Sequence, residues 1–215
     1  MSKKQYKYFD EIDFGNYAPD LQTELKNMIE AKKIWWKLDQ ICLNAPQAVV
    51  WDRQNFPWHE KDFVFGVGSL EVDWRKAEVV DHDVDSDNRI SVDKIDAPKK
   101  AKPLTEDIFD TLCTVFQNTV FEEVYNKLSE KYILGRTRIM KMQPRRCLSW
   151  HYDYTDRLHY PMKTQEGNIM VIEDEVLHLN KDKWYLTKTG YNKHTAINCS
   201  NESRTHLVAC IMGEK

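Results

Sequence analysis

The spacing of hydrophobic and polar residues changes about halfway along the chain, from a helical period to the period of strands. In the first part, Leu21, Leu25 and Met28 recur at intervals of three and four residues behind Pro19, which suits a first helical turn. This spacing predicts a helix over residues 18–41.

The next stretch reads differently. From residue 48 to residue 74, runs such as DFVFGVGSLEVDW are rich in β-branched and aromatic residues and predict strands. Residues 75–103 are charged and poor in large apolar side chains, which indicates an exposed acidic loop. Residues 83–94, DVDSDNRISVDK, imitate a calcium loop, but Lys94 stands where such a loop needs a bidentate glutamate. We therefore interpret this segment as a solvated loop.

A second helix is predicted after Thr105, a candidate helix cap. Apolar residues recur at helical spacing from Ile108 to Phe116, and the pattern continues past a bend near Asn118 to about Lys131.

From Tyr132 onward, short strand patterns follow one another with turn signals and no helix between them. They read ILGRTRIMKMQ, CLSWHYD, NIMVIED, VLHLN, KWYLTKT, HTAINCS and THLVACIM. Seven such segments predict an antiparallel sandwich or barrel of the jelly-roll type, with the helices packed outside it. The expected fold class is α+β. Residues 1–104 form a mixed helix and strand extension and residues 105–215 a helix plus the β core, together one compact unit.

Composition narrows the class of protein. Of 215 residues, 41% are hydrophobic and 12% aromatic, which is typical of a packed globular domain, and the net charge of −3 gives no general attraction to nucleic acid. The five cysteines form no CxxC pair, which favours the reduced thiols of a cytosol over a disulfide framework. No segment approaches the run of about 18 apolar residues that spans a membrane. We expect a cytoplasmic protein without a membrane partner.

Candidate chemistry lies in the β half. His151 and Asp153 are two residues apart on a predicted strand, so their side chains leave the same face. His194 opens another predicted strand, and Arg204 follows ten residues later. Two histidines and a carboxylate form the facial triad of non-haem Fe(II) oxygenases, and an arginine supplies a planar fork for a carboxylate. The alternative for the HxD pair is an ordinary surface hydrogen bond between His151 and Asp153.

These residues also carry a resemblance to a known family. Residues 138–212 resemble the double-stranded β-helix core of the Fe(II)/2-oxoglutarate-dependent oxygenases, in particular the aspartyl/asparaginyl β-hydroxylase-like branch, which includes some free-proline hydroxylases. The matching pieces are HYD at 151–153, RLHYPMKT at 157–164 and HTAINCSNESRTHLV at 194–208.

The resemblance implies a role for each matched residue. His151, Asp153 and His194 would bind Fe(II), Arg204 would pair with the distal carboxylate of 2-oxoglutarate, and Arg157 and His159 would line the cosubstrate pocket. O2 would be the second cosubstrate, with ascorbate as the reductant in vitro. The substrate would be an amino acid or a protein or peptide side chain.

One departure from the branch restricts this transfer. The animal aspartyl hydroxylases lack the metal-binding carboxylate, whereas Asp153 is present here, which favours the HxD-bearing bacterial or phage-type relatives and argues against halogenation. Two other functions stay open at this point. One is a catalytically degenerate β-roll that acts as a binding or scaffold module, and the other is a zinc-dependent, cupin-like hydrolase or isomerase.

Overall fold

The computed structural model describes residues 5–36, 39–46 and 105–215. The elements before the β core are β1 (Phe9–Ile12), α1 (Ala18–Glu30), β2 (Gln40–Cys42), β3 (Asn44–Ala45), η2 (Glu106–Ile108), β4 (Thr111–Leu112), η3 (Thr114–Phe116) and α4 (Val120–Lys131). The core strands are β5 (Tyr132–Met142), β6 (Arg146–Cys147), β7 (Asp156–Lys163), β8 (Asn168–Ile172), β9 (Glu175–Leu177), β10 (Trp184–Thr187), β11 (His194–Asn198) and β12 (Arg204–Glu214).

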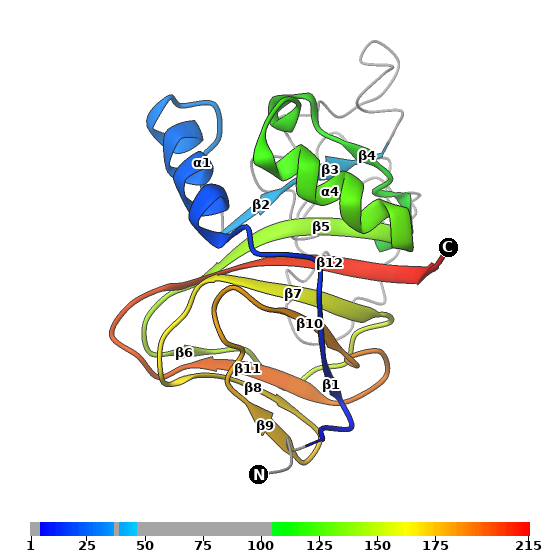
Figure 1. The fold of residues 1–215 in the computed structure, drawn as a ribbon. Helices are drawn as coiled ribbons and strands as arrows, with labels where there is room; N and C mark the ends of the chain where they lie inside the picture. The colour runs from blue at the N-terminus through cyan, green and yellow to red at the C-terminus, as the bar shows by residue number, and fades with distance from the viewer. Residues whose placement is uncertain (1–4, 37–38, 47–104) are drawn as a thin grey trace, which may run out of the picture.

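Two antiparallel sheets face each other and form the core (Figure 1). The larger has the order β1-β10-β7-β12-β5-β2, and the smaller has the order β6-β11-β8-β9. From β5 to β12 the chain passes between the two sheets after every strand or pair of strands. This is the strand order of a double-stranded β-helix, the jelly roll of two Greek keys. The predicted α+β fold with this core is confirmed.

Helices α1 and α4 cover the outer face of the larger sheet (Figure 1). Helix α4 buries Phe121, Val124, Tyr125 and Leu128, which lie on one stripe at helical spacing, and each contributes about 1.5–3 kcal/mol when buried. The Thr119 side chain caps the helix by accepting a hydrogen bond from the backbone N–H of Phe121. No described helix has the length and apolar character needed to cross a lipid bilayer.

The first predicted helix is right at its start and wrong at its end. Helix α1 stops at Glu30, because Lys32 turns to a left-handed φ of 54° and the backbone N–H of Lys33 bonds back to the carbonyl of Met28, as in a Schellman motif. The chain then forms β2 at the edge of the larger sheet instead of continuing as a helix to residue 41.

The second predicted helix begins later than expected. Asn118 has a φ of 59°, which no helix interior tolerates, so the predicted bend is the boundary at which α4 starts. Between Glu106 and Phe116 the chain forms two 3-10 turns and a short strand. The apolar residues there still pack into or against the core, but from irregular backbone.

From β5 onward, one strand was missed and one was predicted too long. Strand β7 contains Pro161, which ordinarily argues against a strand. Here, β10 pairs only with residues 157–159 of β7, and Pro161 lies at a register shift against β12. The predicted strand CLSWHYD is regular only over β6 and continues as single bridges. The predicted strands in 48–74 and the acidic loop 75–103 lie outside the described residues.

Candidate metal centre

The jelly roll brings the HxD segment beside the start of β11. β6 pairs with β11, and beyond β6 the backbone of His151 exchanges two hydrogen bonds with that of His194, at N···O distances of 3.1 and 2.9 Å. The centroids of the two imidazole rings lie 4.2 Å apart. Two residues further on, the carbonyl of Asp153 accepts a hydrogen bond from the backbone N–H of Tyr191 at 2.8 Å. Backbone pairing therefore positions all three candidate ligands.

Both histidines present the same ring nitrogen to the centre. Nδ1 of His151 lies 2.7 Å from the carbonyl oxygen of Ser149, and Nδ1 of His194 lies 2.9 Å from that of Asn192. A carbonyl oxygen only accepts hydrogen bonds, so Nδ1 carries the proton in each ring. Nε2 is then left with a lone pair, which is the arrangement of a metal-binding histidine.

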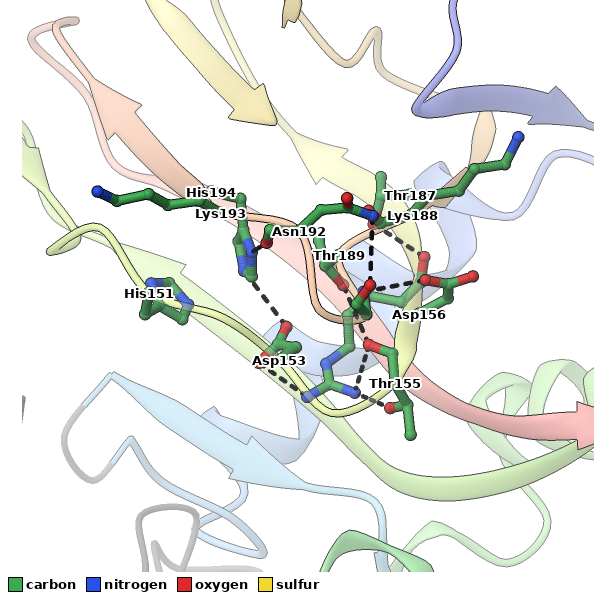
Figure 2. Close-up of polar contacts among 12 residues, drawn as sticks. His151, Asp153, Thr155, Asp156, Thr187, Lys188, Thr189, Asn192, Lys193 and His194 are labelled. Carbon is green, nitrogen blue, oxygen red and sulfur yellow. Dashed lines mark hydrogen bonds and ion pairs between the residues drawn. The ribbon is translucent and has the colours of Figure 1, made fainter. Parts of the chain in front are cut away.

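The ligand atoms converge on one point. The ligand atoms of His151, Asp153 and His194 all lie within 4.8 Å of one another. Two bonds of about 2.2 Å to one ion allow at most about 4.4 Å, so a small inward shift of the side chains would let all three bind the same ion. Figure 2 shows the three side chains directed toward one another. Nε2 of His194 and Oδ2 of Asp153 face each other at 3.3 Å. With Nδ1 protonated these are two acceptor atoms, so a cation or a proton is needed between them.

The electrostatics keep Asp153 ionised and favour a neutral His151. Burial opposes ionisation of Asp153, but a hydrogen bond from His194, formed in the metal-free protein when a proton sits on its Nε2, and the charge of Arg157 outweigh burial and hold the pKa of Asp153 well below its usual value. Burial lowers the pKa of His151, against a hydrogen bond to Ser149 that raises it. A carboxylate and neutral imidazoles form a donor set that suits a divalent metal.

Arg157 lies directly beside the centre. Its Nη2 is 3.0 Å from Oδ1 of Asp153 and 2.7 Å from Oε2 of Glu106, and its Nη1 contacts the carbonyl and hydroxyl oxygens of Thr155. Sequence reasoning missed Glu106, which lies 51 positions from Arg157 and belongs to no spacing motif. Only the packing of η2 against β5 brings the two together.

The barrel interior also holds buried cationic and imidazole groups. Arg204 is 9% exposed and makes no hydrogen bond or ion pair with any residue that the structure describes, and burial alone lowers its pKa to about 10. The rings of His159 and His206 meet edge to face at 5.8 Å. Among the described residues, Nδ1 of His159 and both ring nitrogens of His206 have no hydrogen-bond partner. Buried polar atoms of this kind need a partner, which an ordered water or a bound polar ligand would supply.

The predicted site residues therefore fall into two groups. His151, Asp153 and His194 lie together and could hold a metal ion. Arg204 and His159 are buried in the same barrel, while Arg157 contacts Asp153. That Arg204, Arg157 and His159 bind a cosubstrate stays a prediction.

Comparisons with known proteins give distant similarities of fold. No family model matches the sequence, and no curated protein matches it. Among solved structures, an oxidoreductase of the 2OG-Fe(II) oxygenase family from Burkholderia pseudomallei is 17% identical, over 42% of this chain and 47% of that one, with a TM-score of 0.33. A cupin domain from Bordetella pertussis Tohama I is 20% identical over 36% of this chain and 81% of the other, with a TM-score of 0.32. This chain thus spans less than half the length of the Burkholderia protein.

Proposed function

We propose that the protein is an Fe(II)- and 2-oxoglutarate-dependent dioxygenase that hydroxylates a C–H bond of an amino acid or of a protein or peptide side chain. The observation that carries the proposal is the pairing of two features in one barrel. A His-Asp-His group has its metal-binding atoms turned inward, and a buried arginine has no partner among the described residues.

The donor set fits ferrous iron. Two neutral imidazoles and one carboxylate leave coordination positions open, as the facial triad of non-haem Fe(II) oxygenases does, whereas structural zinc sites close all four positions. Nε2 of His194 and Oδ2 of Asp153 are two acceptor atoms 3.3 Å apart, and a divalent ion bound to both would remove the repulsion between their lone pairs.

The charged and polar side chains inside the barrel suit a ligand with two carboxylates. Arg204 carries its charge at neutral pH, and a guanidinium binds a carboxylate through two parallel hydrogen bonds. His206, two residues along β12 and therefore on the same face, has both ring nitrogens free among the described residues, and one of them can donate to the same carboxylate. A metal at one end and a cation deeper in the barrel suit the keto-acid and distal carboxylate ends of 2-oxoglutarate.

When bound, iron and 2-oxoglutarate supply the oxidation: 2-oxoglutarate and O2 become succinate and CO2, and one oxygen atom enters a substrate C–H bond. The protein supplies orientation and charge. The backbone bonds between His151 and His194 fix two ligands, and Arg157 fixes the third. Arg204 selects a cosubstrate with a second carboxylate.

The remaining expectations belong to the same proposal. We place the reaction in the cytoplasm, where thiols stay reduced, with a small molecule or a protein side chain as substrate rather than nucleic acid or a membrane. In vitro, ascorbate would keep the iron ferrous.

Succinate formation tests the proposal. Protein reconstituted with Fe(II) and ascorbate should convert 2-oxoglutarate to succinate slowly in the presence of O2, even without substrate, and His194→Ala should abolish the conversion. His178→Ala is the matched control, because His178 is a half-buried histidine that bonds to the backbone carbonyl of Asn168 and lies outside the triad. A mass-spectrometric search for products heavier by one oxygen atom would identify the substrate. Succinate no higher than in the blank, after amino acids and peptides have been screened, would refute the proposal and favour a scaffold.

A further inference from the structure

We infer that Glu106 is a positioning residue of the metal centre: it holds Arg157 so that Asp153 offers a single oxygen atom, Oδ2, to the metal. The inference rests on the metal-binding part of the proposed function. It assigns a role to a residue that lies outside the barrel strands and outside every motif of the sequence.

All four hydrogens on the terminal nitrogens of Arg157 have acceptors among the described residues. Each terminal nitrogen of a guanidinium carries two N–H groups. Nη1 directs its hydrogens at the two oxygens of Thr155, while Nη2 is 2.7 Å from Oε2 of Glu106 and 3.0 Å from Oδ1 of Asp153. With one hydrogen of Nη2 given to Glu106, only one is left for Asp153.

This distribution decides how Asp153 is held. An unrestrained arginine prefers a bidentate fork on a carboxylate, with both oxygens engaged. Such a fork on Asp153 would occupy Oδ2, the oxygen that faces Nε2 of His194 at 3.3 Å. Glu106 and Thr155 prevent the fork, so Oδ1 is bound to the protein and Oδ2 is left for the ion.

Charge balance supports the same role. The side chain of Arg157 is 5% exposed, that of Asp153 20% and that of Glu106 24%, so the three charges interact with little screening by water. Arg138 Nη2 lies 4.0 Å from the other oxygen of Glu106. Despite burial, the charges of Arg157 and Arg138 lower the pKa of Glu106, which keeps it ionised at neutral pH. Without this carboxylate, an uncompensated guanidinium would repel a divalent cation and compete with it for Asp153.

A glycine in β5 allows the backbone at Glu106 to pack closely against the sheet, which brings Glu106 near the metal centre. A Cβ placed on Gly135 of β5 would lie 2.7 Å from the carbonyl oxygen of Glu106, closer than real Cβ contacts come. The absence of a side chain at Gly135 therefore lets η2 lie directly against β5.

Cobalt titration of the full-length protein tests the inference without any turnover. Co(II) substitutes for Fe(II), is stable in air-free buffer, and reports its ligands through its visible absorption. Glu106→Gln removes the charge and keeps the shape, and we expect it to weaken Co(II) binding by about 10- to 100-fold and to change the visible spectrum, as loss of outer-shell partners does. Glu202→Gln, which removes a carboxylate from an exposed ion pair with Lys163, is the control and should leave both readouts unchanged.

A double-mutant cycle separates positioning from a general loss of structure. If Glu106 acts through Arg157, Glu106→Gln should have less than a threefold effect on Co(II) affinity in an Arg157→Met background, because no guanidinium then competes for Asp153. The inference would be overturned if Glu106→Gln weakened Co(II) binding equally in the parent and Arg157→Met proteins, or if it did not weaken Co(II) binding in the parent protein. If Glu106→Gln does not fold, Glu106→Asp, which keeps the charge but shortens the side chain, replaces it in the same cycle. If parent and Glu202→Gln protein both fail to bind Co(II), the metal centre itself is refuted.

Discussion

Replacing Arg204 by methionine should change stability and cosubstrate binding in opposite directions. The arginine is buried, and burial alone lowers its pKa from 12.5 to about 10. At neutral pH, this drop corresponds to a penalty of about 3 kcal/mol on keeping the guanidinium charged inside the protein. No carboxylate among the described residues offsets the penalty, so the charged side chain destabilises the ligand-free protein.

Arg204→Met removes the charge but keeps most of the side-chain volume. We expect the free energy of unfolding of the ligand-free protein, measured by urea denaturation, to rise by about 1–3 kcal/mol, since a buried charge is replaced by an apolar group. Affinity for 2-oxoglutarate, measured by calorimetry with a redox-inert divalent metal, should fall. Loss of one partner from a buried charge pair costs about 2–5 kcal/mol, or roughly 30-fold to several thousand-fold in Kd.

The exposed Arg146 of β6 provides the control. Arg146→Met should shift stability by less than about 0.5 kcal/mol and leave 2-oxoglutarate affinity unchanged. If Arg204→Met destabilises the ligand-free protein and binds 2-oxoglutarate normally, Arg204 has a structural role and the cosubstrate assignment is wrong.

Two further predictions concern buried polar groups. Burial and the nearby Arg204 charge lower the pKa of His159 to about 3, and burial lowers the pKa of His206 well below 6.5. Between about pH 6 and pH 4.5, these two histidines therefore bind protons in the unfolded chain but not in the native metal-free protein. Stability should fall on acidification by about 1.4 kcal/mol per pH unit for each of these histidines, and His206→Gln should remove one such contribution in urea titrations across this range. Asn198→Ala should lower the free energy of unfolding by about 2–4 kcal/mol in the same assay, because the amide nitrogen bonds to the carbonyls of Met142 and Gln143 at the end of β5 and of Glu202 just before β12. An unchanged midpoint would refute that role.

The chain's local patterns predicted much of the fold. The β-branched and aromatic runs from β5 onward, separated by turn signals, identified most of the core strands, and the first turns of α1 followed from Pro19 and the spacing of Leu21, Leu25 and Met28. The HxD pair and His194 were selected as candidate metal ligands because their side-chain types recur at suitable strand positions, and the structure brings their ligand atoms within 4.8 Å of one another.

What the sequence did not reveal depends on contacts between distant parts of the chain. Glu106 reaches Arg157 across 51 positions, and no periodicity relates them. Strand β7 was missed, and its Pro161 fits within a strand only because the pairing with β12 shifts register there, which depends on a distant part of the chain. The start of α4 was misplaced because apolar residues of a 3-10 turn can share the spacing of a helix.

The proposed function requires that His151, Asp153 and His194 together bind one ferrous ion. Its most direct test is an anaerobic titration of the protein with Fe(II) in the presence of excess 2-oxoglutarate, followed by the visible charge-transfer absorption of a keto acid chelated to ferrous iron. The absorption should saturate at one Fe(II) per chain and be lost in His151→Ala and His194→Ala, both of which should still unfold cooperatively. No saturable absorption in the parent protein, or an unchanged titration in either variant, would contradict the account.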